Sequence, residues 1–233
     1  YQSNFRPKKI AIKEISNGRE TSYYELNQRS KSLAGWLQKK GLKKGDRVAI
    51  LAHNCAEVFE LEFACGKIGG VELPLNWRLT KPELEYILND SKPMCLIYSV
   101  EFKDIAQELI KDCGIKNSLL LEEDNYGSEY EQAISENNDF ETVESNHDDL
   151  IMLMYTSGTT GHPKGAMINH QMQFFNTVNL GVTARITDKT VQLVVLPLFH
   201  TGGMNCYANP ILHNGGQIVL MKEFDPGKAL EII

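Results

Sequence analysis

The sequence has no hydrophobic run long enough to cross a membrane and does not open with a signal-peptide pattern. Cysteine is scarce, with five residues among 233 and no C-x-x-C pair. An odd number of widely spaced cysteines argues against disulfides and favours a reducing, cytoplasmic setting. Because the histidines show no i, i+4 pairing either, the sequence predicts no zinc site. Peripheral membrane contact and homo-oligomer formation are left open.

Basic clusters interleaved with aromatic residues are also absent, which argues against a nucleic-acid partner. The net charge of −6 is unevenly distributed. Residues 122–149 carry eleven acids and no Lys or Arg, so the remainder has 19 acids against 24 bases and can accept an anionic ligand. We interpret the acidic segment as a mostly solvated surface excursion with one short helix around residues 130–135.

Strand-type apolar runs alternate with amphipathic helix patterns through the first half of the chain. Ser22 and Thr80 are each followed three residues later by Glu, which predicts a capping box at the start of two helices. Asn54 with Glu57 is expected to cap a third helix. The alternation predicts an α/β fold, with layered βα units, mostly parallel sheets and helices on both faces. Strands are expected at residues 10–14, 21–22, 47–52, 71–75, 94–98 and 118–121.

The second half continues this pattern, with strands expected at 150–155, 190–196 and 217–221. Helices are expected at 170–180, at 204–213 with a break at Pro210, and from Asp225 onward. We divide the chain into a first βα block (1–121), the acidic excursion (122–149) and a second βα block (150–233).

The string Tyr-Thr-Ser-Gly-Thr-Thr-Gly-His-Pro-Lys-Gly, residues 155–165, follows a buried strand directly. Glycines let backbone N–H groups approach a ligand closely, and hydroxyls and a lysine suit phosphate oxygens. The string therefore predicts a phosphate-binding loop, the alternative being a solvated turn without a ligand. A Walker A loop is disfavoured because no Ser or Thr follows Lys164. With three glycines and no apolar side chain, residues 157–164 are expected to be mobile without nucleotide.

This string resembles the signature loop of the AMP-forming adenylating superfamily, which includes acyl-CoA synthetases, luciferases and peptide-synthetase adenylation domains. The resemblance implies that the loop holds the β- and γ-phosphates of ATP while a carboxylate attacks the α-phosphorus. Acyl-adenylate and pyrophosphate would be the products. The implied phosphate-binding residues are Thr156, Ser157, Gly158, Thr159, Thr160, Gly161 and Lys164.

A second motif, Pro-Leu-Phe-His-Thr-Gly-Gly at residues 197–203, lies where an expected strand ends. On its own, His200 would be an ordinary loop or core histidine. Together with the upstream loop, the motif resembles the acyl-CoA synthetase branch of the superfamily. There the histidine would orient the acyl carboxylate, and Gly202 and Gly203 would leave room for the substrate. Cys206 is expected to be a buried thiol.

The family's downstream Tyr-Gly-x-Thr-Glu element and C-terminal lysine domain have no counterpart in this sequence. We therefore expect the N-terminal part of a ligase that uses ATP, Mg²⁺ and CoA on a carboxylic acid, most simply a fatty acid, and that is inactive in this form. No residue is assigned to adenine, ribose, Mg²⁺ or CoA. An aryl-acid ligase, a non-catalytic nucleotide- or acyl-binding scaffold and a phosphate-binding NTPase are the alternatives. An apolar sheet edge near residues 217–221 is expected to favour self-association.

Overall fold

The computed structural model describes residues 1–122, 127–136, 139–156, 161 and 163–232, which fall into two compact units. The first, called here the turn unit, comprises Tyr1–Leu26, His53–Ala56 and Phe174–Ile233. The second, the hairpin unit, comprises Asn27–Ala52 and Glu57–Gln173. The two units interleave along the sequence and were defined independently of the three consecutive segments expected above. That division into three segments stays a prediction.

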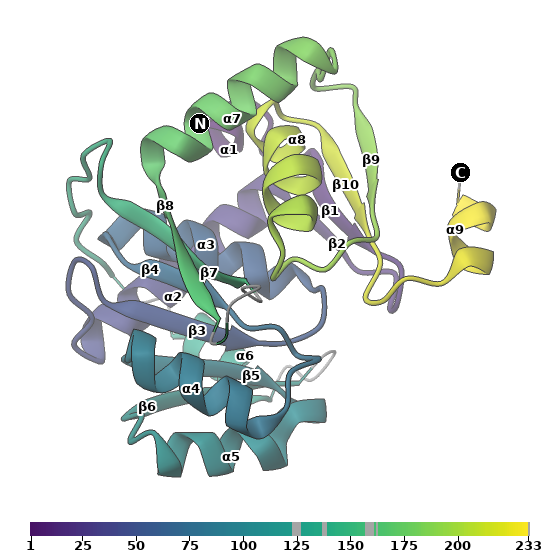
Figure 1. The fold of residues 1–233 in the computed structure, drawn as a ribbon. Coiled ribbons are helices and arrows are strands. Elements are labelled where there is room, and N and C mark those ends of the chain that lie inside the picture. The colour runs from purple at the N-terminus through teal and green to yellow at the C-terminus, as the bar shows by residue number, and fades with distance from the viewer. Residues whose placement is uncertain (123–126, 137–138, 157–160, 162, 233) are drawn as a thin grey trace. The chain divides into compact units, whose positions relative to one another are not determined.

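The hairpin unit contains a six-stranded sheet in the order β6-β5-β3-β4-β7-β8 (Figure 1). All neighbours are parallel except β7 and β8, which form an antiparallel hairpin. This confirms the mostly parallel sheet expected from the alternating pattern. The strands are β3 (Arg47–Leu51), β4 (Val71–Pro74), β5 (Cys95–Ser99), β6 (Asn117–Leu121), β7 (Leu150–Thr156) and β8 (Lys164–Asn169).

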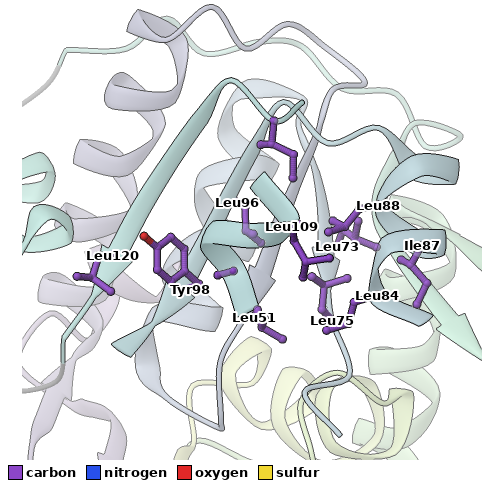
Figure 2. Close-up of a cluster of buried hydrophobic side chains, with 13 residues drawn as sticks. Leu51, Leu73, Leu75, Leu84, Ile87, Leu88, Leu96, Tyr98, Leu109 and Leu120 are labelled. Carbon is purple, nitrogen blue, oxygen red and sulfur yellow. The ribbon is translucent and has the colours of Figure 1, made fainter. Parts of the chain in front are cut away.

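Helices cover both faces of this sheet, as predicted. On one face, α4 (Lys81–Ser91) and α5 (Lys103–Asp112) contribute Leu84 and Leu109 to a buried cluster with Leu73 and Leu96 (Figure 2). On the other face, Glu72 of β4 lies beside Cys65 of α3 (Ala56–Ile68). The chain also forms α2 (Tyr23–Lys39), η1 (Val100–Phe102), α6 (Glu129–Ser135) and α7 (His170–Thr183).

The turn unit has a four-stranded sheet in the order β2-β1-β10-β9, so strands from the two ends of the chain lie side by side (Figure 1). The predicted exposed edge at residues 217–221 is wrong, because β10 pairs in parallel with β1 on one side and β9 on the other. The strands are β1 (Ile10–Glu14), β2 (Glu20–Ser22), β9 (Val191–Val194) and β10 (Gln217–Leu220), and the helices are α1 (Gln2–Phe5), η2 (Gly202–Ala208), α8 (Asn209–His213) and α9 (Pro226–Ile232).

Both predicted capping boxes are confirmed. The Ser22 backbone N–H donates to Glu25 Oε2 at 2.8 Å, and the Thr80 N–H donates to Glu83 Oε2 at 2.8 Å. The helix cap predicted at Asn54 is wrong, because the Asn54 side chain bonds to backbone groups of distant residues. Instead, Glu14 Oε1 accepts a hydrogen bond of 3.2 Å from the Ala56 N–H at the start of α3.

The acidic excursion is fastened to the hairpin unit at α6, the short helix expected there. Tyr130 of α6 is only 1% exposed, and its hydroxyl donates to Glu60 Oε2 at 2.8 Å. Arg29 Nη1 donates to Glu131 Oε2 at 2.9 Å, and the same guanidinium donates to Glu60. An arginine shared between two carboxylates compensates for their burial, so α6 is a packed element rather than a solvated loop.

Glu72 is a fully buried carboxyl in the middle of the six-stranded sheet. It pairs with Val48 of β3 on one side and Met152 of β7 on the other. Within the described residues, neither of its side-chain oxygens has a hydrogen-bond partner. Burial and, after it, the neighbouring Glu62 carboxyl raise the pKa of Glu72 well above its ordinary value of 4.5. Glu72 is therefore protonated in the folded chain at pH values where it ionises in the unfolded one.

This raised pKa makes stability depend on pH. Because the folded state binds the proton more tightly, the free energy of unfolding falls as pH rises from about 4.5 toward the folded pKa. The loss can reach about 1.4 kcal/mol per pH unit for one proton. We predict that Glu72→Gln, which cannot ionise, flattens this slope in denaturant titrations carried out at increasing pH above about 4.5. Glu144→Gln, at an exposed position of the same unit, serves as the control and should keep the wild-type slope; equal slopes for all three proteins would contradict the assignment.

Candidate functional site

The predicted phosphate loop connects the two strands of an antiparallel hairpin. Thr156, the last residue of β7, pairs with Lys164, the first residue of β8, and both side chains are exposed. The hairpin therefore presents a hydroxyl and an ammonium group directly opposite each other at the base of the loop. That combination suits phosphate oxygens, because a lysine is a mobile point charge and threonine supplies a short donor.

The end of β7 is held by a contact that the motif alone does not reveal. The hydroxyl of Tyr155 donates a hydrogen bond to Asp90 Oδ2 at the end of α4. Partial burial and this carboxylate raise the pKa of Tyr155, which keeps the phenol protonated as a donor. Across the hairpin, Tyr155 pairs with Gly165, where an added Cβ would lie 3.3 Å from the tyrosine ring and 2.8 Å from Leu153 Cδ1. Gly165 thus allows β8 to lie close against β7.

The remaining loop residues lie outside the described part of the chain. These are Ser157, Gly158, Thr159 and Thr160 of the predicted phosphate-binding set. The expected mobility of residues 157–164 falls largely on the same positions. Gly161 is described and has φ of +124°, a conformation that favours glycine. The phosphate-binding role of the whole set stays a prediction.

His200 lies in the turn unit, on the segment that connects β9 to η2. Its backbone N–H donates to the Pro197 carbonyl at 3.2 Å, and its ring Nδ1 accepts from the Gly202 N–H at 3.1 Å. With Nδ1 acting as an acceptor, the neutral imidazole carries its proton on Nε2. The exposed ring is therefore oriented as a hydrogen-bond donor, which is the property that the sequence interpretation requires of it.

Gly203 is required by the close approach of the chain to itself. An added Cβ would lie 2.3 Å from the Pro197 oxygen and 2.7 Å from the Leu196 oxygen, both backbone atoms. At Gly202 the nearest atoms are His200 Nδ1 at 3.2 Å and Leu196 Cδ1 at 3.3 Å, which belong to side chains that can move. Contact of either glycine with a substrate stays a prediction.

The helical segment after His200 differs from the expectation in two respects. A π-helical stretch, η2, begins at Gly202 and runs directly into α8, with Pro210 in the first turn of α8, so the predicted break at Pro210 is wrong. Cys206 is exposed, so the predicted buried thiol is wrong. The buried side of η2 is formed by other residues, namely Gly203, Met204, Asn205 and Ala208.

The sequence interpretation missed two features of this site. The strand β8 was not expected, because none of its residues is buried and they supply no alternating apolar signal. Asn54 was interpreted as a helix cap, although its amide bonds to the backbone on both sides of Pro197. No local pattern could have revealed a partner about 140 residues away.

Comparison with known proteins places these motifs in a family. Residues 1–233 match the AMP-binding enzyme family, so the chain belongs to it, as the resemblance predicted. It is 36% identical over 216 residues to the feruloyl-CoA synthase of Amycolatopsis sp, an alignment that covers 93% of this chain and 42% of that protein. It is 30% identical to the long-chain-fatty-acid–CoA ligase FadD13 of Mycobacterium tuberculosis, with coverage of 97% and 45%.

A solved structure agrees with the fold. The ATP-bound structure of MatB from Rhodopseudomonas palustris matches with a TM-score of 0.87 and 32% identity, over 99% of this chain and 46% of that one. The chain thus spans less than half the length of each of these proteins. Among the described residues, no helix is both long and apolar enough to span a bilayer.

The two glycines after His200 provide a matched stability test. We predict that Gly203→Ala lowers the free energy of unfolding by about 1–3 kcal/mol, since a methyl group there overlaps backbone atoms that cannot rotate away. Gly202→Ala should cost less, because its neighbours are side-chain atoms. Denaturant unfolding of both variants measures the difference, and equal losses would refute the packing argument.

Proposed function

We propose that the full-length protein is an acid–thiol ligase of the acyl-CoA synthetase type. It activates a carboxylic acid with ATP, forming acyl-AMP and pyrophosphate, and then transfers the acyl group to CoA. The observation that carries this proposal is the hairpin between β7 and β8, which sets Lys164 opposite Thr156 at the base of the family's signature loop. Membership in the AMP-binding enzyme family and the similarity to named CoA ligases support it.

In the first step, a carboxylate oxygen attacks the α-phosphorus of ATP, and the bond from that phosphorus to the departing pyrophosphate breaks. Thr156, Gly161 and Lys164, with Ser157, Gly158, Thr159 and Thr160, hold the outgoing phosphates. The Lys164 ammonium offsets the negative charge that builds up on the leaving group. Mg²⁺ is expected to neutralise further phosphate charge, and none of these residues is assigned to it.

His200 is the residue proposed to orient the acid. A proton on Nε2 lets the ring donate to one carboxylate oxygen while the other attacks, so the histidine acts by positioning and not as a nucleophile. Gly202 and Gly203 are proposed to border the acyl group. In the second step, the CoA thiol attacks the acyl carbonyl and AMP leaves with the former carboxylate oxygen.

The favoured substrate is a fatty or other lipophilic acid, and an aryl acid is the second candidate. One relative is named for a long-chain fatty acid and another for feruloyl-CoA, so both classes occur among similar proteins. Carboxylate-dependent exchange of pyrophosphate into ATP by the full-length protein, across short, long and aryl acids, distinguishes them. Failure of every acid to support exchange would overturn the enzyme proposal in favour of a nucleotide- or acyl-binding scaffold. A cytoplasmic location is part of the proposal and is supported by the five free thiols.

Lys164 provides the direct test of the phosphate role. In the full-length enzyme, Lys164→Ala should lower kcat for exchange at least about tenfold, because neutralisation of the leaving group matters most in the transition state. Lys116→Ala, which removes an exposed lysine elsewhere in the hairpin unit, should leave kcat unchanged. A change confined to KM for the acid would show that Lys164 does not act on the phosphates.

The 233-residue chain alone should show no measurable exchange. It spans less than half of its relatives, and its sequence has no Tyr-Gly-x-Thr-Glu element. Loss of even one preorganised electrostatic donor typically costs about 10²–10³ in rate, and several would be missing together. The purified chain is compared with the full-length protein in the same assay. Exchange that disappears in its Lys164→Ala variant would show that the chain suffices for adenylation.

A further inference from the structure

Asn54 lies in the loop between β3 and α3, is 5% exposed and uses its whole side-chain amide on the backbone of distant residues. Its Nδ2 donates to the Leu196 carbonyl at 3.0 Å and to the Met221 carbonyl at 3.1 Å. Its Oδ1 accepts from the Leu198 N–H at 2.9 Å. Both amide hydrogens and the amide oxygen are therefore committed.

These bonds clamp the segment that leads into His200. Leu196 and Leu198 lie on either side of Pro197, whose carbonyl accepts the His200 backbone N–H. The third bond reaches Met221, just after β10, and Met221 itself donates to the Val194 carbonyl at the end of β9. Asn54 thus joins the ends of two neighbouring strands to the start of the turn formed by residues 197–200, called here the histidine turn.

The role requires an amide. A carboxylate of the same size has no hydrogen to donate to the Leu196 and Met221 carbonyls. It would place a negatively charged oxygen against both carbonyl oxygens, which repel it. A helix cap does not explain the residue, since the Ala56 N–H donates to Glu14. The turn has little freedom on its other side, where Gly203 lies against the Pro197 oxygen.

We propose that Asn54 is a positioning residue for activation of the acid: it fixes the turn that holds the His200 ring in its orienting geometry. This inference rests on the proposed function, because His200 has to act on the carboxylate for its position to matter. A misplacement of about 1 Å in a positioning group can cost as much as a hundredfold in rate. Asn54 belongs to neither motif that predicted the site.

The test is a double-mutant cycle in the full-length protein, with Asn54→Asp, His200→Ala and both together. Pyrophosphate exchange gives kcat and KM for the acid and for ATP. Asn54→Asp alone should lower kcat/KM for the acid roughly ten- to hundredfold and leave KM for ATP unchanged. In the His200→Ala background it should change kcat/KM less than twofold, because the group that it positions is gone. Equal losses in both backgrounds would overturn the proposal.

A matched control separates positioning from general damage. Asn214 also donates its Nδ2 to a backbone carbonyl, that of Pro210 at 2.8 Å, in the same unit. Asn214→Asp should leave the kinetic constants at wild-type values. Where Asn54→Asp does not fold, Asn54→Ser is used, since its hydroxyl introduces no charge, and the same cycle applies.

Hydrogen exchange distinguishes failure of this inference from failure of the proposed function. The Leu198 amide should exchange faster in the Asn54 variant than in wild type, and at the wild-type rate in Asn214→Asp. If no acid supports pyrophosphate exchange, the proposed function falls and the positioning role falls with it, whatever the amide shows. If the wild-type protein catalyses pyrophosphate exchange and Asn54→Asp changes neither that activity nor hydrogen exchange at the Leu198 amide, only the inference about Asn54 is overturned.

Discussion

A buried polar group costs free energy unless a partner satisfies it, and for several side chains of this protein the partners come from distant segments. Asn54 bonds to Leu196, Leu198 and Met221, and Arg29 bonds to Glu60 and Glu131. Glu14 accepts from the first amide of α3. Each of these side chains ties a loop or a helix to a remote part of its own unit. At Asn54, such contacts join the ends of β9 and β10 to the segment that leads into His200.

Whether the partner of a polar side chain lies close by or far away along the sequence explains what the sequence could predict. Ser22 with Glu25 and Thr80 with Glu83 are capping boxes whose partners lie within one helical turn, and both were predicted correctly. Asn54 with Glu57 has the same pattern, yet the prediction failed because more distant carbonyls and a distant N–H engage the amide. The strand β8 was missed because none of its residues is buried, so its sequence carries no alternating apolar pattern. The central place of β10 in its sheet depends on pairing with β1, which no local pattern encodes.

For the candidate site, the sequence predicted the motifs but not what holds them. Lys164 and His200 were identified from strings of neighbouring residues, whereas Tyr155 with Asp90 and Asn54 with Leu198 emerge only from the fold. In both units, a side chain with a proposed role lies beside a strand end that a distant side chain anchors. Such anchoring reduces the freedom that a substrate would otherwise have to remove on binding.

The parallel pairing of β1 with β10 has a consequence for how the protein is made. Ile12 and Ile218 are partners, so the first strand emerges from the ribosome long before the strand that it needs. Until then β1 has only β2 beside it, and an isolated two-stranded hairpin is marginally stable in water. The strands of the hairpin unit, which all lie between residues 47 and 169, can pair earlier during synthesis. Within residues 1–233, β1 is therefore among the last strands to gain its partner, and its open edge has to be kept from wrong partners until β10 emerges.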